Sequence, residues 1–212
     1  MKDINKQQVE NAIKKLIEWF PEETENLEVN KELIVNYFLD KNKPVHPTLK
    51  EIKHVTVKDQ ENFDTLSLTA CEEAIAIVVV DVIMFVFGLV GLHISNQERL
   101  TRSLIRKLGP STLRGFSRAV HNFSVAKGAM AKSKALFALM GGIWKAGGFK
   151  AAFKIAKDEM TWWEWVKTGT IAVVQITAWF ATDGIAFIAE AALVIMSAEQ
   201  LIEDAIKAGK VC

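Results

Sequence analysis

Cysteine is scarce in this sequence: Cys71 and Cys212 are the only two in 212 residues. Two cysteines so far apart give neither the paired spacing of a zinc site nor the dense framework of a small disulfide-stabilised domain. A single bridge between them stays open, although no other feature of the sequence supports it. At this length the chain can bury a hydrophobic core without cross-links.

Proline is also scarce, with four residues in the whole chain, three of them before position 50. Proline interrupts helices, and strand-favouring patterns are few, whereas alanine, leucine, lysine and glutamate are abundant. The sequence therefore predicts an all-α fold, arranged as a helical bundle.

The residue patterns that mark catalytic and metal centres are missing. The four histidines are scattered, and no two of them have the spacing of metal ligands on one helix. The glycine pairs within 141–148 lack the ending of a phosphate-binding loop, and no serine lies in a nucleophile elbow. We therefore expect no enzymatic activity, no metal, no cofactor and no small-molecule substrate.

Acidic residues are absent from Arg99 to Lys157, a stretch with 13 lysines and arginines that we call the basic band. Within it, Arg99, Arg102 and Arg106 fall three and four positions apart and so share one helix face. A solvated helix surface is the simplest explanation of such a stripe. The alternative is contact with an anionic surface, for which lipid is favoured over nucleic acid.

The end of the basic band, 141–157, has the pattern of an amphipathic helix. Apolar side chains, among them Phe149 and Phe153, share one face. The cations of this segment lie elsewhere, at Lys145, Lys150, Lys154 and Lys157. This pattern is typical of a helix that lies on anionic membrane, and also of a surface helix whose glycines let another helix cross closely.

The N-terminal region is charged and lacks the apolar core of a secretory signal, so we expect no signal peptide. Such a protein would be cytoplasmic until released, or secreted by a non-classical route. Helical spacing of apolar residues predicts two amphipathic helices, and two prolines within 41–47 predict a linker after them. We expect an N-terminal region, 1–47, followed by a main helical domain, 48–212.

The stretch from Thr161 to Ile206 is poor in charge at its centre, since only Asp183 and Glu190 are charged between Thr168 and Ala198. Thr161 and Glu164 form the pattern of a capping box, which predicts a helix start, and Thr182-Asp183-Gly184 predicts a turn. We therefore expect a hydrophobic hairpin of two helices, 162–181 and 185–208. A polar stripe that stays in phase across Gly184 also fits one continuous helix.

Three tryptophans stand at the start of this stretch: Trp162, Trp163 and Trp165. They lie where the aromatic belt of a membrane-spanning segment would be, and they could equally fill a core. They complete the predicted membrane-docking set, which otherwise consists of Arg99, Arg102, Arg106, Lys145, Lys150, Lys154 and Lys157.

A second apolar helix is expected at about 70–93, because the run 74–92 contains one charged residue, Asp81. Its length is almost that of a membrane span, and it equally suits the centre of a bundle. Asp81, Asp183 and Glu190 each interrupt an apolar run, and burial would raise their pKa values. The alternative is that Asp183 caps a helix, Glu190 faces solvent and Asp81 pairs with an arginine of the basic band.

An apolar hairpin of membrane length beside a cationic segment resembles, in pattern, the pore-forming helical toxins of the colicin type. The resemblance covers the apolar segments and no motif. It implies a membrane-active protein, soluble at rest, whose basic band docks on anionic lipid before the hairpin inserts, with 74–92 as a further candidate for insertion. The alternative is a soluble helical bundle that binds a lipophile, a partner protein or a second copy of itself.

Overall fold

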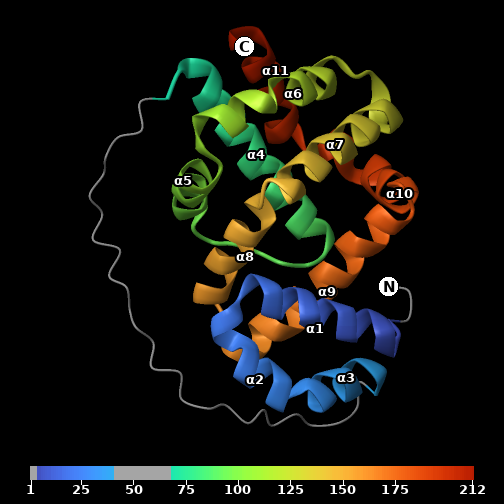
Figure 1. Cartoon of the computed structure of the whole chain (residues 1–212). Coiled ribbons are helices and arrows are strands. Elements are labelled where there is room, and N and C mark those ends of the chain that lie inside the picture. Colours follow the sequence, from blue (N-terminus) through green and yellow to red (C-terminus); the bar gives the residue numbers. More distant parts are fainter. Residues whose placement is uncertain (1–3, 41–67) are drawn as a thin grey trace. The chain divides into compact units, whose positions relative to one another are not determined.

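The computed structural model describes residues 4–40 and 68–212 of the chain. The chain forms two units, Met1–Ser67 and Leu68–Cys212, which we call unit 1 and unit 2 and describe separately (Figure 1). The predicted linker, 41–47, and the predicted boundary at residue 47 lie outside the described residues. Over the ranges described, every regular element is a helix, so the predicted all-α bundle is confirmed.

Unit 1 contains four helices in its described part: α1 (Lys6–Trp19), η1 (Pro21–Glu23), α2 (Thr24–Val29) and α3 (Lys31–Leu39). Asn5 and Gln8 form a reciprocal capping box at the start of α1, and Pro21 follows its end. One face of α1 buries Val9, Ile13 and Leu16, and α1 packs on α3. The predicted amphipathic character of this region is therefore confirmed for α1.

Unit 2 contains the remaining helices. In chain order they are α4 (Ala70–Leu89), α5 (Gln97–Gly115), α6 (Ser117–Val125), α7 (Gly128–Lys145), α8 (Gly148–Asp158), α9 (Trp162–Ala181), α10 (Ile185–Val194), η2 (Ile195–Ser197) and α11 (Glu199–Val211).

Helix α4 is the central helix of unit 2, with α5 and α11 as its main neighbours and α6 and α7 also in contact (Figure 1). Its start is fixed by a capping box between Thr69 and Glu72. Buried side chains occur all round the helix, among them Ile75, Val79 and Phe87. The apolar run 74–92 therefore forms the core of the bundle, because a helix surrounded by others is apolar on every side.

Helix α9 begins at the Thr161–Glu164 capping box and ends at Ala181, as predicted. The chain then turns at Asp183 (φ 49°) and Gly184 (φ 81°). The axes of α9 and of α10 with η2 differ in direction by 114°. The interpretation of this stretch as one continuous helix is therefore wrong.

The predicted second arm of the hairpin, 185–208, is not one helix: α10 ends at Val194, and α11 begins at Glu199 after η2. The physical reason is that the two segments bury their apolar side chains against different neighbours. Phe187 of α10 lies against α7, whereas α11 packs on α4 and α6. One straight helix could not serve both neighbours.

Within the described ranges, no single helix has both the length and the apolar composition to cross a membrane. Helix α9 reaches that threshold only together with α10 and η2, as a pair bent by 114°.

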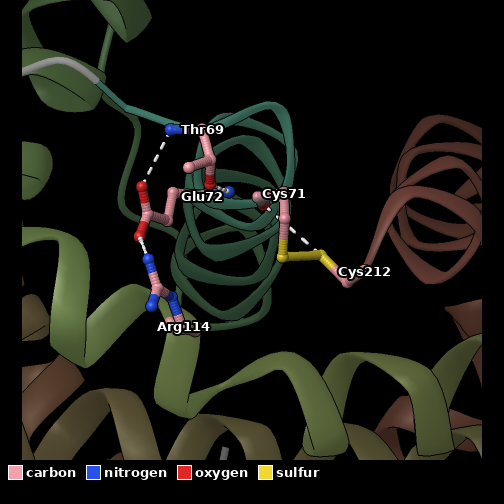
Figure 2. The surroundings of a disulfide bond; sticks show 5 residues. All are labelled: Thr69, Cys71, Glu72, Arg114 and Cys212. Carbon is pink, nitrogen blue, oxygen red and sulfur yellow. Dashed lines mark hydrogen bonds and ion pairs between the residues drawn. A yellow bond between two sulfur atoms is a disulfide. The ribbon is translucent and has the colours of Figure 1, made fainter.

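A disulfide joins Cys71, in the first turn of α4, to Cys212, which follows α11 (Figure 2). Their Cα atoms are 5.0 Å apart, an ordinary distance for this bond. The bridge that the sequence left open is therefore present. It fastens the C-terminal end of α11 to the N-terminal end of α4.

Candidate functional site

Helix α10 is almost wholly apolar, with Glu190 as its one charged residue, yet it lies on the surface of unit 2. Only Phe187 and Ala191 are buried, together with Ile195 of η2. The Phe187 ring lies 5.7 Å from the Phe137 ring of α7, which marks the side that faces the bundle.

The opposite side of α10 exposes large apolar side chains. The exposed fractions are 73% for Ile185, 86% for Leu193 and 55% for Met196, and Ala189 between them is also exposed. Ile185, Ala189 and Leu193 are spaced by four positions, so they share one face of α10, and Met196 follows in η2. We call Ile185, Ala189, Leu193 and Met196 the α10 stripe. Single exposed apolar residues are common, but a contiguous line of them marks an interaction surface.

The Glu190 side chain lies inside the corner between α9 and α10. Its carboxylate accepts hydrogen bonds from Nε2 of Gln175 at 3.1 and 3.2 Å and from the indole N–H of Trp179 at 3.1 Å. Both donors belong to α9, so Glu190 ties the two helices together across the turn. The bend thus brings together Gln175 and Glu190, two residues of the polar stripe that stays in phase across Gly184.

Asp183 and Glu190 are both exposed, so of the two interpretations that the sequence left open, burial applies to neither residue. Asp183 stands in the turn itself, with a positive φ that aspartate adopts more readily than most residues. Glu190 faces solvent, which was the alternative interpretation of this residue.

Helices α5 and α8 run antiparallel and carry most of the basic band. At one end, the backbone N–H groups of Ser95 and Asn96 donate to the Glu159 carboxylate at 2.7 and 3.2 Å, and Arg99 pairs with Asp158 at 2.6 Å. At the other end, a Cβ built on Gly147 would lie 3.4 Å from Cε of Lys107. These contacts place Arg102 and Arg106 at about the levels of Lys154 and Lys150.

The predicted docking cations differ in how free they are to meet a ligand. Arg99 is paired with Asp158, and Arg102 is paired with Glu98. Arg106, Lys145 and Lys154 are exposed, and Lys150 is half-buried. We call these last four residues the basic surface.

The remaining member of the basic band in the docking set, Lys157, places its Nζ 5.5 Å from the centre of the Trp165 ring. This position directs the cation toward an aromatic face of the protein. Trp165 itself is fully buried, so it lies in the core and not on a membrane-facing surface. Trp162 and Trp163 are half-buried, and their rings stack at 6.3 Å.

The apolar face of α8 is not available to a membrane. Phe149, Phe153 and their neighbours on that face are buried, and the Phe153 ring lies 5.0 Å from the Phe87 ring of α4. The interpretation of 141–157 as a helix lying on lipid with its apolar side inserted is therefore wrong for this folded state. Helix α8 offers charge at the surface, while its apolar side chains belong to the core.

Asp81 does not pair with an arginine of the basic band, because its neighbour is Asp204 of α11. Burial, together with the charge of Asp204 and a hydrogen bond to it, raises the pKa of Asp81 to about 7, with Lys207 acting in the opposite direction. Burial works to raise the pKa of Asp204 as well, but hydrogen bonds from Lys207, at 2.9 Å, and from Gln200 give a net lowering. Of the three carboxylates singled out by the sequence, Asp81 is the one that the core perturbs.

We expect Asp81→Asn to raise the free energy of unfolding at pH 8 by about 1–2 kcal/mol, after allowance for the water that still reaches this carboxyl. Because the folded pKa lies above the ordinary value of 3.8, this group contributes stability that is complete below about pH 4 and lost as the pH rises through 7. Urea unfolding at pH 5.5 and 8 measures the effect. The exposed Glu73→Gln on the same helix is the control, and an equal gain there would contradict the assignment.

Sequence reasoning missed three buried charged residues, Glu23 in unit 1 and Glu72 and Lys132 in unit 2. Glu72 is buried and pairs with Arg114 of α5 at 2.6 Å, and the backbone N–H of Thr69 and this arginine lower its pKa (Figure 2). Lys132 of α7 is buried, donates to the Phe123 carbonyl at 3.3 Å and lies 5.1 Å from the ring centre of that residue. The spacing of Thr69 and Glu72 fits a capping box, which could have marked Glu72 as a structural residue. Nothing in the sequence near Lys132 indicates that its side chain is buried.

Among the described residues, no group of three or more histidine, cysteine or acidic side chains is placed to hold a metal ion. No family model, curated protein or solved structure matches the chain. Function must therefore be argued from the α10 stripe, the basic surface and their surroundings.

Proposed function

We propose that this protein is membrane-active, binds anionic membranes and enters them with the α9–α10 segment, in the manner of a pore-forming helical protein. The observation that carries the proposal is the α10 stripe, because the molecule leaves its most apolar surface helix uncovered. A bilayer surface is a partner that needs no shaped pocket, only apolar depth and negative charge.

Simple energetics indicate that the α10 stripe needs a second attraction. Complete burial of a leucine, isoleucine or methionine contributes about 1.5–3 kcal/mol, so partial burial of three such side chains gives roughly 3–5 kcal/mol. That is no more than the marginal, reversible binding of one short acyl chain. Each cation near an anionic leaflet adds about 1 kcal/mol, so the basic surface is the second attraction.

The Cys71–Cys212 disulfide supports passage through an oxidising compartment, because such bonds form and persist outside the reducing cytoplasm. A protein that acts after release from the cell fits this expectation. The disulfide thus favours release over permanent cytoplasmic residence.

Replacement of Leu193 and Met196 by serine is expected to reduce binding to phosphatidylglycerol-containing vesicles at least tenfold. Both side chains are exposed, so their loss leaves the bundle intact while removing the deepest part of the α10 stripe. Co-sedimentation with the vesicles, followed by dye release, measures binding and permeabilisation. The matched control is Val125→Ser with Met130→Ser, which removes two apolar side chains of similar exposure, 57% and 56%.

Several outcomes would decide against the proposal. Failure of the unaltered chain to bind such vesicles would end it, and equal losses in both double variants would deny a special role to the α10 stripe. Binding that persists at 1 M salt would show that the basic surface does not contribute, because the attraction between exposed charges is screened at that salt concentration. Self-association through Leu193 and Met196 without vesicle binding would favour the interaction-protein alternative.

The proposal confines insertion to α9 and α10 and leaves α4 in place. Protonation of Asp81 favours the folded contact between α4 and α11, so acid holds α4 in the core. Dye release that is stronger at pH 5 than at pH 7 would then have a cause other than the protonation of Asp81.

A further inference from the structure

Helix α11 packs on α4 and α6, but it contributes few large apolar side chains of its own to that interface. Its buried residues are Leu201, Ala205 and Ala208, of which only the leucine is large. Gly209 lets the helix approach α6 closely, because a Cβ built there would lie 2.9 Å from Oγ of Ser124. Helix α11 therefore packs closely against α6 but buries only one large side chain of its own.

The same interface places two carboxyl groups against each other. Asp204 of α11 faces Asp81 of α4, and the cation nearest to this pair, Lys207, is itself on α11. Lys207 therefore neutralises the charge of Asp204 within α11, but it forms no ion pair that joins α11 to α4. Above neutral pH the two carboxylates repel each other across the interface.

Two connections hold α11 in place along the chain. Its C-terminal end is fixed by the Cys71–Cys212 disulfide, and its N-terminal end continues from α10 through η2. Because η2 joins α10 directly to α11, the C-terminal end of α10 has two supports, its own packing on α7 and its connection to α11.

We infer that α11 is a redox-controlled clasp, by which we mean a helix that holds α10 against the bundle as long as the Cys71–Cys212 disulfide is intact. Reduction of this disulfide by thiols releases α11 and, with it, α10. This inference rests on the proposed function, since it describes how α9–α10 becomes free to enter a membrane. The disulfide keeps α11 on α4, and a thiol-rich environment at the target would reduce the disulfide and release α11.

The chemistry is ordinary thiol–disulfide exchange. A thiolate from the environment attacks Sγ of Cys212, which is exposed, forms a mixed disulfide and releases the Cys71 thiolate, which takes a proton. A second thiol attacks the mixed disulfide and releases the Cys212 thiolate. Two thiols are oxidised to one disulfide, and Cys71 and Cys212 receive the two electrons and two protons.

Hydrogen exchange of the oxidised and the dithiothreitol-reduced full chain, without vesicles, tests the clasp. Reduction is expected to accelerate amide exchange in α11 at least tenfold more than in α7 and α8. Cys71→Ser with Cys212→Ser should behave like the reduced protein with or without dithiothreitol. Acceleration that is equal in all three helices, or absent from α11, would overturn the clasp.

Dye release from phosphatidylglycerol-containing vesicles is the second measurement, and it is expected to rise at least threefold on reduction. Selective exchange in α11 together with this rise supports the clasp as the regulator. Selective exchange without any dye release, oxidised or reduced, supports the clasp and overturns the proposed function. Dye release that is the same before and after reduction overturns the regulatory role of the disulfide but supports membrane activity.

Discussion

Removal of the Cys71–Cys212 disulfide is expected to lower the free energy of unfolding of unit 2 by about 2–5 kcal/mol. The bridge joins residues 141 positions apart and so encloses every helix from α4 to α11. In the chain-entropy account, closing so long a loop restricts the unfolded chain strongly, which raises its free energy relative to the folded state. This is a large share of the stability that a domain of this size normally has.

The measurement is urea unfolding of Cys71→Ser with Cys212→Ser, followed by tryptophan fluorescence. Five of the six tryptophans belong to unit 2, so the signal reports mainly on that unit. The unaltered protein in dithiothreitol should give the same midpoint as the double variant, and the double variant should not respond to dithiothreitol. A loss below 1 kcal/mol would mean that the disulfide contributes little to unit 2.

Replacement of Gly184 by alanine is expected to destabilise unit 2 by about 2–5 kcal/mol. Two costs add at this position. Gly184 has φ 81°, a conformation that residues with a Cβ adopt at a cost of about 1–2 kcal/mol. The new Cβ would also lie 2.5 Å from the Phe137 ring, and such overpacking typically costs a further 1–3 kcal/mol.

The chain offers a matched control for the backbone term. Gly91 has φ 75° and would meet nothing within 4 Å, so Gly91→Ala should show the backbone cost alone, about 1–2 kcal/mol. The difference between the two variants measures the contact between the α9–α10 corner and α7. Equal losses would show that the corner yields easily, which would itself favour its movement in membrane binding.

Local sequence patterns predicted much of the helical framework. The Thr161–Glu164 capping box gave the start of α9, and its end was marked by the Thr182-Asp183-Gly184 turn, because both signals depend on neighbours within a few residues. The apolar run around Asp81 gave α4 for the same reason. The break between α10 and α11 escaped prediction, since it depends on which distant helices each segment meets.

The candidate site was predictable only in its components. The sequence marked the cations of the basic band, but it could not show that Arg99 pairs with Asp158 while Arg106 remains exposed. It also left open whether Trp165 and the apolar side of α8 meet a membrane or a core, and both lie in the core. Periodicity tells which residues share a face, but only packing tells what that face meets.

Composition and periodicity alone determined that this protein is helical, that one segment is purely cationic and that its last third is rich in apolar residues. Tertiary structure alone decided that α4 is buried while α10, equally apolar, is exposed. It also brought Cys71 to Cys212 and Asp81 to Asp204. The physical reason is that apolar character fixes the free energy available from burial, whereas the neighbours that a segment acquires on folding decide whether that burial takes place.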